Sequence, residues 1–150
     1  MKPVVQEDMT GCAIAAVAAA AGVPYRQAKK AAKSLGICVY DKTLWSETFH
    51  VRNLLKHFGL SAAAKQTPFR SWTSLPDLAL LSTKWHLEDG KPFWHWVVFV
   101  REKDRTYILD SKKALRHNKR TDFGRIKPKW YIGLRKRGAS LPDIISHDSI

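Results

Sequence analysis

The sequence predicts an α+β domain in which N-terminal helices pack on a C-terminal antiparallel sheet. Helix-forming segments dominate residues 10–59, and runs rich in β-branched and aromatic residues follow from residue 78 onward. The 150 residues, 45% of them hydrophobic, suit a single domain with one core and exclude a disordered chain. We therefore expect one domain over residues 1–140 and a C-terminal tail over residues 141–150.

Three helices are expected in the N-terminal half. The first two are alanine-rich, and glycine and proline residues mark their ends. The third has apolar residues near helical spacing and ends before Gly59. Their expected bounds are 10–22, 24–36 and 45–58. Between the second and the third, Ile37–Tyr40 is a short apolar segment, so we expect its Cys38 to lie in the core.

Four strands are expected in the C-terminal half, separated by turn-forming residues. They are Leu78–Thr83, Phe93–Val100, Arg105–Asp110 and Trp130–Arg135. A hairpin centred on Lys103-Asp104 would join the second and third of these strands and place Val97 opposite Asp110.

The two cysteines imply neither a disulfide framework nor a structural zinc site, because no CxxC pair is present. No metal or organic cofactor is implied. The longest uncharged run, Met9–Tyr25, has 17 residues, whereas a membrane-spanning helix needs roughly 20. Glu7 and Asp8 precede this run, where a signal peptide would carry positive charge. We expect a cytoplasmic protein with reduced thiols and no transmembrane segment.

Cys12 is the first candidate for chemistry, because it lies in the first turn of the expected alanine-rich helix. The amides at a helix N-terminus stabilise an anion, and a thiolate is the attacking species in acyl transfer. The alternative is that Cys12 is a small buried residue of the core.

His95 is the preferred base for such a nucleophile, because it lies in the run WHWVVFV, where a polar ring needs a partner. The hairpin register places His95 diagonally across from Asp110 on one face of the sheet, close enough for the side chains to meet. The two would be a base and its orienting acid, or a structural pair. His86 is the weaker candidate for the base. Gln6, six residues before Cys12, is a candidate side-chain donor to an oxyanion.

The segments QEDMTGCAIAAVAAAAGV and HWVVFVREKDRTYILD together resemble the bacteriocin-processing cysteine peptidases, papain-like domains that precede many peptide-exporting ABC transporters. The resemblance extends over about residues 5–132 and implies a papain-like fold, a peptide substrate and a bacterial cytoplasmic location. It also implies Cys12 as nucleophile, His95 as general base, Asp110 as its orienting acid and Gln6 as oxyanion donor.

The chain departs from the family at two places. Gly11 and Ala13 flank Cys12 where the family usually has Asp and Gly, and Ser111 follows Asp110 where the family usually has Pro. These departures bear on whether the substrate is a double-glycine leader, and less on the catalytic role of the matched residues. The favoured function is therefore a stand-alone papain-like cysteine peptidase that cleaves a peptide or amide bond. The alternatives are a catalytically idle peptide-binding module of the same fold and a nucleic-acid-binding domain.

Basic residues outnumber acidic ones by 26 to 13, for a net charge of +13. Residues 112–137, here called the basic segment, contain eleven basic residues and a single acid, Asp122. We expect this segment to form a solvated positive surface, suited to an acidic peptide or protein substrate, a nucleic acid or an anionic membrane. The alternative is that the surface only solubilises the protein. No nucleic-acid-binding motif accompanies the segment, so a nucleic-acid partner is the less favoured alternative.

Overall fold

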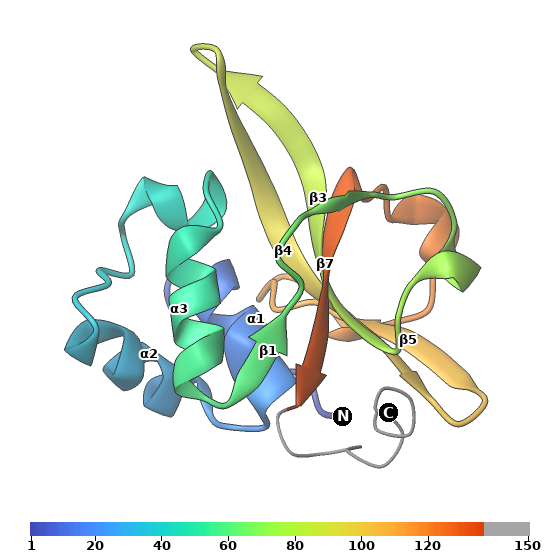
Figure 1. Ribbon diagram of the computed structural model, residues 1–150, viewed down its shortest axis with the longest axis horizontal. Helices are drawn as coiled ribbons and strands as arrows, with labels where there is room; N and C mark the ends of the chain where they lie inside the picture. Colours follow the sequence, from blue (N-terminus) through green and yellow to red (C-terminus); the bar gives the residue numbers. More distant parts are fainter. Residues whose placement is uncertain (137–150) are drawn as a thin grey trace.

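The computed structural model describes residues 1–136, and over them the predicted α+β architecture is confirmed. The α-helices lie to one side of an antiparallel sheet (Figure 1). The helices are α1 (Cys12–Ala21), α2 (Tyr25–Ser34) and α3 (Phe49–His57), with 3-10 turns η1 (Lys42–Trp45), η2 (Trp72–Ser74) and η3 (Phe123–Arg125). The strands are β1 (Leu60–Ala62), β2 (Thr67–Pro68), β3 (Leu78–Glu88), β4 (Lys91–Glu102), β5 (Arg105–Leu109), β6 (Lys119–Arg120) and β7 (Trp130–Lys136). None of the helices within residues 1–136 has the length and apolar character needed to cross a membrane.

The sheet is built around the β3–β4 hairpin. Its strand order is β1-β7-β3-β4-β5-β6, with β2 paired to β7, and every pairing is antiparallel. The register predicted for the β4–β5 hairpin is confirmed, because Val98 pairs with Leu109 and Glu102 with Arg105. Asp110 follows directly on β5 and continues this register toward Val97.

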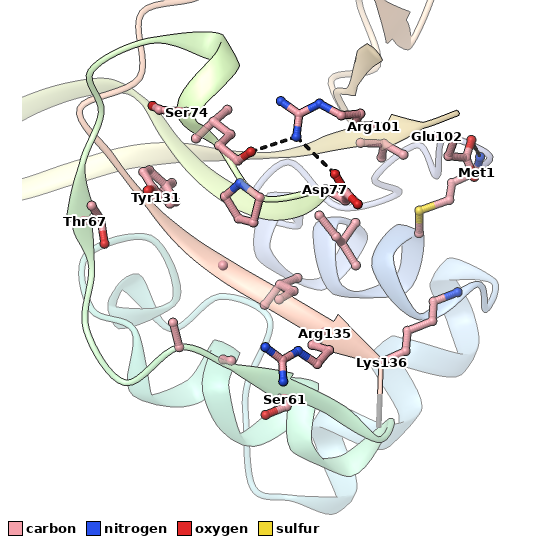
Figure 2. Close-up of a pocket in the computed structure, with 18 residues that line it drawn as sticks. Met1, Ser61, Thr67, Ser74, Asp77, Arg101, Glu102, Tyr131, Arg135 and Lys136 are labelled. Carbon is pink, nitrogen blue, oxygen red and sulfur yellow. Dashed lines mark hydrogen bonds and ion pairs between the residues drawn. The ribbon is translucent and has the colours of Figure 1, made fainter. Parts of the chain in front are cut away.

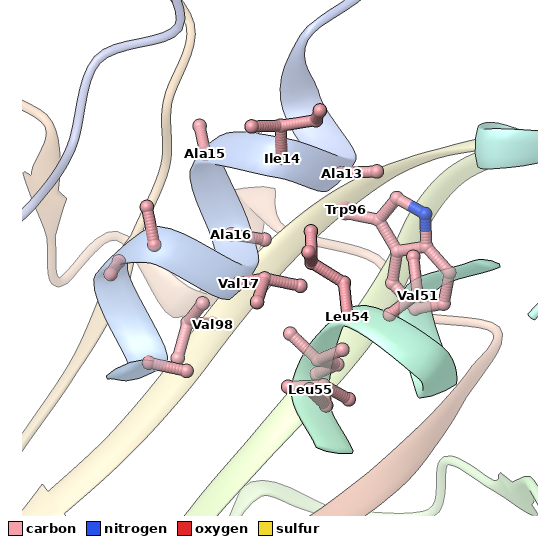
Figure 3. Packing of buried hydrophobic residues seen from close by; sticks show 14 of the residues in the cluster. Ala13, Ile14, Ala15, Ala16, Val17, Val51, Leu54, Leu55, Trp96 and Val98 are labelled. Carbon is pink, nitrogen blue, oxygen red and sulfur yellow. The ribbon is translucent and has the colours of Figure 1, made fainter. Parts of the chain in front are cut away.

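Helix α1 is central to the core on one face of the sheet, and every residue from Cys12 to Ala20 is buried. Because alanine side chains are small, the helix backbone can approach both β4 and α3. Figure 3 shows Ala16 and Val17 facing Leu54 of α3 and Val98 of β4. On the opposite face of the sheet, a second apolar cluster includes Phe99 and packs against side chains from η2 and η3. The core therefore fixes where α1 begins relative to β4.

Two expectations from the sequence are wrong. The third helix begins at Phe49, because residues 42–45 form a separate 3-10 turn that Asp41 caps through a hydrogen bond to the Thr43 amide. Cys38 is exposed rather than buried. Its neighbours Ile37 and Val39 are buried instead, and Cys38 begins a turn in which its carbonyl accepts from the Asp41 amide at 3.0 Å.

The remaining differences between the expected and the observed strands are three additional short strands and a longer β3–β4 hairpin. The strands β1, β2 and β6 have only two or three residues each, too few for an alternating pattern to predict them. Conversely, β3 and β4 extend beyond their expected bounds. The expected domain end at residue 140 and the tail over residues 141–150 lie outside the described residues.

The outer half of the β3–β4 hairpin projects beyond its neighbours (Figure 1). Strand β7 pairs with β3 only over Ala79–Ser82, and β5 pairs with β4 only over Val98–Glu102. The β3–β4 register shifts between Thr83 and His86, which is a bulge. Thr83 is the partner of His95, so the bulge begins immediately beside that histidine.

Candidate active site

Cys12 is the first residue of α1, and its side chain is nearly buried, with 8% of its surface exposed. The helix begins there because Gly11 accepts the first intrahelical hydrogen bond, from Ala15 at 2.9 Å. Gly11 also permits a close approach: a Cβ on this residue would lie 2.2 Å from the hydroxyl oxygen of Tyr25. That hydroxyl donates to Asp8 at 2.6 Å and thereby holds the loop that leads into the helix.

His95 and Asp110 form the pair that the hairpin register predicts. Nε2 of His95 lies 2.8 Å from Oδ1 of Asp110, and the exposed fractions of the two side chains are 16% and 2%. The Cys12 side chain also acts on His95 and contributes to raising its pKa, which indicates that the thiol lies near the imidazole. Because Nε2 of His95 contacts Asp110, Nδ1 is the ring nitrogen left for the thiol.

This arrangement favours a protonated imidazole. Burial opposes the charge on His95, but the hydrogen bonds to Asp110 and Cys12 outweigh it and raise the pKa of His95 to about 9. Burial likewise opposes the charge on Asp110, yet the hydrogen bonds from His95, the Lys112 amide and Arg120 lower the pKa of Asp110 to about 2. The pair is therefore an imidazolium and a carboxylate at neutral pH.

Asp110 has a second cationic partner that the sequence did not indicate. Nη1 of Arg120 donates to Oδ2 of Asp110 at 3.0 Å, while its Nε and Nη2 donate to Asp122 at 2.9 and 2.7 Å. Asn118 completes the support, because its side-chain amide donates to the backbone carbonyl of Asp110 at 2.7 Å. Arg120 lies on β6, a two-residue strand within the basic segment, and no motif distinguishes it from its basic neighbours. The expectation that the basic segment is uniformly solvated is therefore wrong at Arg120.

Gln6 is held by hydrogen bonds on every side of its amide. Its Nε2 donates to the carbonyls of Asp8 at 3.0 Å and Met9 at 2.9 Å, and its Oε1 accepts from the Ser111 hydroxyl at 2.8 Å. Both N–H groups of the amide are thus engaged within the protein. Ser111 directly follows Asp110, so its hydrogen bond connects Gln6 to the segment that carries the carboxylate.

The other candidate base, His86, lies elsewhere. It is on the outer part of β3, where its ring contacts Glu88 at 2.7 Å and the carbonyl of Lys84 at 2.8 Å. Both side chains of the His86–Glu88 pair are more than half exposed. Of the two histidines singled out from the sequence, only His95 has a pKa that Cys12 influences.

A large cavity is separate from this group of residues. It has a volume of about 950 Å³ and lies between β1, β7 and the segment preceding β3 (Figure 2). Its rim includes Arg101, which donates to the Leu75 carbonyl at 2.8 Å and to Asp77 at 3.1 Å. Neither Cys12 nor His95 lines it.

The fold resembles that of a known protease. No protein-family model matches the chain, and no curated protein matches it in sequence. Among solved structures, a double-glycine motif protease from an AMS/PCAT transporter, in complex with the leader peptide, matches with a TM-score of 0.56. The chain is therefore similar in fold to a double-glycine motif protease. The match covers 90% of this chain and 91% of that chain at 16% sequence identity, so the likeness is one of fold.

Proposed function

We propose that the protein is a papain-like cysteine peptidase in which Cys12, His95 and Asp110 cleave a peptide or amide bond. The observation that carries the proposal is the His95–Asp110 pair, with the Cys12 thiol among the groups that raise the pKa of His95. The protease fold of the structural neighbour supports it independently. The position of Cys12 at the start of α1 supports it further, because unpaired amides at a helix start stabilise a thiolate.

The proposed reaction proceeds through an acyl-enzyme. His95 holds the Cys12 proton as an imidazolium before the substrate reacts, and the sulfur attacks the carbonyl carbon to give a tetrahedral oxyanion. The carbon–nitrogen bond then breaks as His95 returns the proton to the leaving amine, which leaves a thioester on Cys12. Water attacks the thioester while His95 accepts its proton, and the carbon–sulfur bond breaks to release the acid and the thiol.

The backbone amide of Cys12 is the first proposed donor to the oxyanion, because the opening N–H groups of a helix have no intrahelical partner. Gln6 is the second. For this role its side chain must exchange the carbonyl of Asp8 or Met9 for the oxyanion, since both of its N–H groups are engaged. We expect Gln6→Ala to lower turnover by about 10²-fold, the usual cost of losing one oxyanion donor.

The exposed Cys38 provides an internal reference for a test of the nucleophile. A thiol beside a charged imidazole and at a helix start reacts faster than a thiol without such neighbours. We expect iodoacetamide to modify Cys12 faster than Cys38 at pH 6, although Cys12 is the more buried of the two. Peptide-level mass spectrometry over time measures both rates in one sample.

Two histidine variants identify the base. His95→Ala should lower the rate at Cys12 at least tenfold and leave Cys38 unchanged, whereas the matched variant His86→Ala should alter neither rate. Loss of the Cys12 rate in His86→Ala alone would reassign the base. Equal rates for Cys12 and Cys38 in the wild type would overturn the nucleophile assignment.

A peptide-binding module of the same fold is the second candidate, and the engaged amide of Gln6 is the observation that favours it. A mixed peptide library, analysed for new termini after incubation, separates the two functions. A peptidase yields cleavage that Cys12→Ala abolishes. A binding module yields no cleavage, and the wild type and Cys12→Ala retain the same peptides.

A further inference from the structure

Asp110 is held at its backbone and at its carboxylate by residues 118–122, the segment that contains β6. Its N–H donates to the Asn118 carbonyl at 2.8 Å, and its own carbonyl accepts from the Asn118 side-chain amide at 2.7 Å. Its Oδ2 accepts from Nη1 of Arg120 at 3.0 Å. Strand β6 pairs with β5 and thereby brings this segment beside Asp110. The segment therefore determines how the carboxylate is presented to His95.

The guanidinium of Arg120 lies between two carboxylates. Its Nε and Nη2 donate to the two oxygens of Asp122 at 2.9 and 2.7 Å, a bidentate contact that fixes the plane of the guanidinium. Nη1 is left for Asp110. The hydrogen bonds to Asp122 and Asp110 outweigh burial and raise the pKa of Arg120, so its positive charge persists wherever His95 titrates.

The two oxygens of Asp110 thus have separate cationic partners. Oδ1 lies 2.8 Å from Nε2 of His95, while Oδ2 accepts from Arg120. Solvent screens this carboxylate little, because its side chain is 2% exposed. The guanidinium therefore acts on the imidazolium in two ways. It restrains the rotation of the carboxylate, and it attracts part of the negative charge that would otherwise act on His95 alone.

We propose that Arg120 is a positioning residue that directs Oδ1 of Asp110 toward His95 and weakens the hold of this carboxylate on the imidazolium proton. The inference rests on the proposed function, in which His95 must give that proton to the leaving amine. A proton that is held too tightly is given up slowly. Arg120 therefore keeps the imidazolium acidic enough to serve as the proton donor, while Asp110 keeps it charged.

Other charged groups lie around His95, and the test variants leave them in place. Cys12 comes from α1, and Asp110 from the end of β5. Lys112 follows Asp110, and its backbone N–H donates to Oδ1 of that carboxylate at 3.2 Å. From β3, Lys84 lies in the bulge next to the strand partner of His95. A changed titration of His95 can then be assigned to the substituted residue.

The test is the midpoint of the His95 ring titration, measured by NMR. In Arg120→Gln we expect the midpoint to rise by about half a pH unit to one pH unit, because a positive charge a few ångströms away is removed. A purely structural role gives the opposite sign. If the loss of Arg120 only allowed Asp110 to turn away, the midpoint would fall toward that of Asp110→Asn.

Two milder variants keep the test decisive if Arg120→Gln is too unstable to titrate. Arg120→Lys retains the positive charge, so its midpoint should stay within a few tenths of a pH unit of the wild type. Asp122→Asn leaves the guanidinium with one counter-charge fewer, so the midpoint should fall by a few tenths of a pH unit. A midpoint in Asp122→Asn that is unchanged or higher would overturn the proposal.

Arg116→Gln is the matched control, because it removes the same charge from an exposed side chain of the basic segment. We expect its midpoint to equal that of the wild type. The proposal is also overturned if Arg120→Gln leaves the midpoint unchanged or lowers it, or if Arg116→Gln raises it equally. The comparison of Cys12 with Cys38 by iodoacetamide does not depend on these midpoints. Failure of this proposal and failure of the peptidase assignment are therefore distinguishable.

Discussion

The imidazole of His95 must be charged when the leaving amine departs, so its protonation limits the proposed reaction at high pH. With a pKa of about 9, His95 is protonated at pH 7 and loses its proton as the pH rises through 9. The hydrogen bond that His95 donates to Asp110 raises this pKa, so Asp110→Asn should move the titration to lower pH. NMR titration of the His95 ring, assigned with His95→Ala, measures both midpoints. Identical midpoints in the wild type and Asp110→Asn would show that Asp110 does not hold the charge.

The same titration affects stability. Because the folded state raises the pKa of His95 from 6.5 to about 9, the stabilisation is fully present below pH 6.5 and is lost as the pH rises through 9. We expect the free energy of urea unfolding to fall between pH 6.5 and 9 by more in the wild type than in His95→Ala. Parallel curves for the two proteins would contradict the linkage.

Arg120 is expected to stabilise the fold through the carboxylate that it shares with His95. The Arg120→Gln variant removes the guanidinium that contacts Oδ2 of Asp110, and the Asp110 side chain is only 2% exposed. Breaking such a pair costs about 3 kcal/mol, so urea unfolding should show a loss of this size. Arg116→Gln is the control, since Arg116 is an exposed residue of the basic segment and its replacement should change stability little.

The sequence indicates the candidate residues that depend on local pattern and misses those that depend on tertiary contact. His95 and Asp110 were paired from the hairpin register, which a two-residue turn determines. Arg120 was not indicated, because it has no distinctive neighbour in sequence. Cys38 was misplaced because a short apolar run does not reveal which of its residues point outward.

At the level of elements, the start of α1 depends on the absence of a side chain at Gly11. A Cβ there would meet the Tyr25 hydroxyl at 2.2 Å and the Asp8 carbonyl at 3.2 Å. Gly11→Ala should therefore destabilise the protein by about 1–3 kcal/mol, as overpacking does. It should also slow Cys12 alkylation, because the helix start moves.

Two variants separate this clash from a general effect of replacing glycine. In Gly11→Ala/Tyr25→Phe the hydroxyl is absent, so part of the stability lost in Gly11→Ala should return, as measured by urea unfolding. Gly124→Ala should be neutral, because its Cβ would meet no atom within 4 Å. A Gly11→Ala protein as stable as Gly124→Ala would mean that the loop before α1 adapts without cost.

The arrangement of elements was largely predictable because local patterns changed type once, from helical to alternating, near the middle of the chain. The β3 bulge was not predictable, because a register shift depends on how two strands twist together rather than on either sequence. The strands at the sheet edges were also missed, since β2 and β6 have two residues each.

For the whole molecule, the net charge of +13 predicts weak attraction to any polyanion. Binding to random DNA should be weak and should fall steeply with salt, because it depends on counterion release. If the surface that attracts DNA does not include the candidate active site, saturating DNA should leave the iodoacetamide rate at Cys12 unchanged in a competition assay. Sequence-selective binding that persists at high salt would instead favour the nucleic-acid alternative.

The projecting half of the β3–β4 hairpin has a consequence for the solution behaviour of the protein. Within residues 1–136, no strand pairs with the outer edges of β3 and β4 there. Open strand edges are where separate chains join into intermolecular sheets. A bulge and charged side chains hinder such joining, and this hairpin has both, with the bulge at Lys84 and the His86–Glu88 pair near the tip. Aggregation during concentration or storage should therefore begin at this hairpin when salt screens its charges.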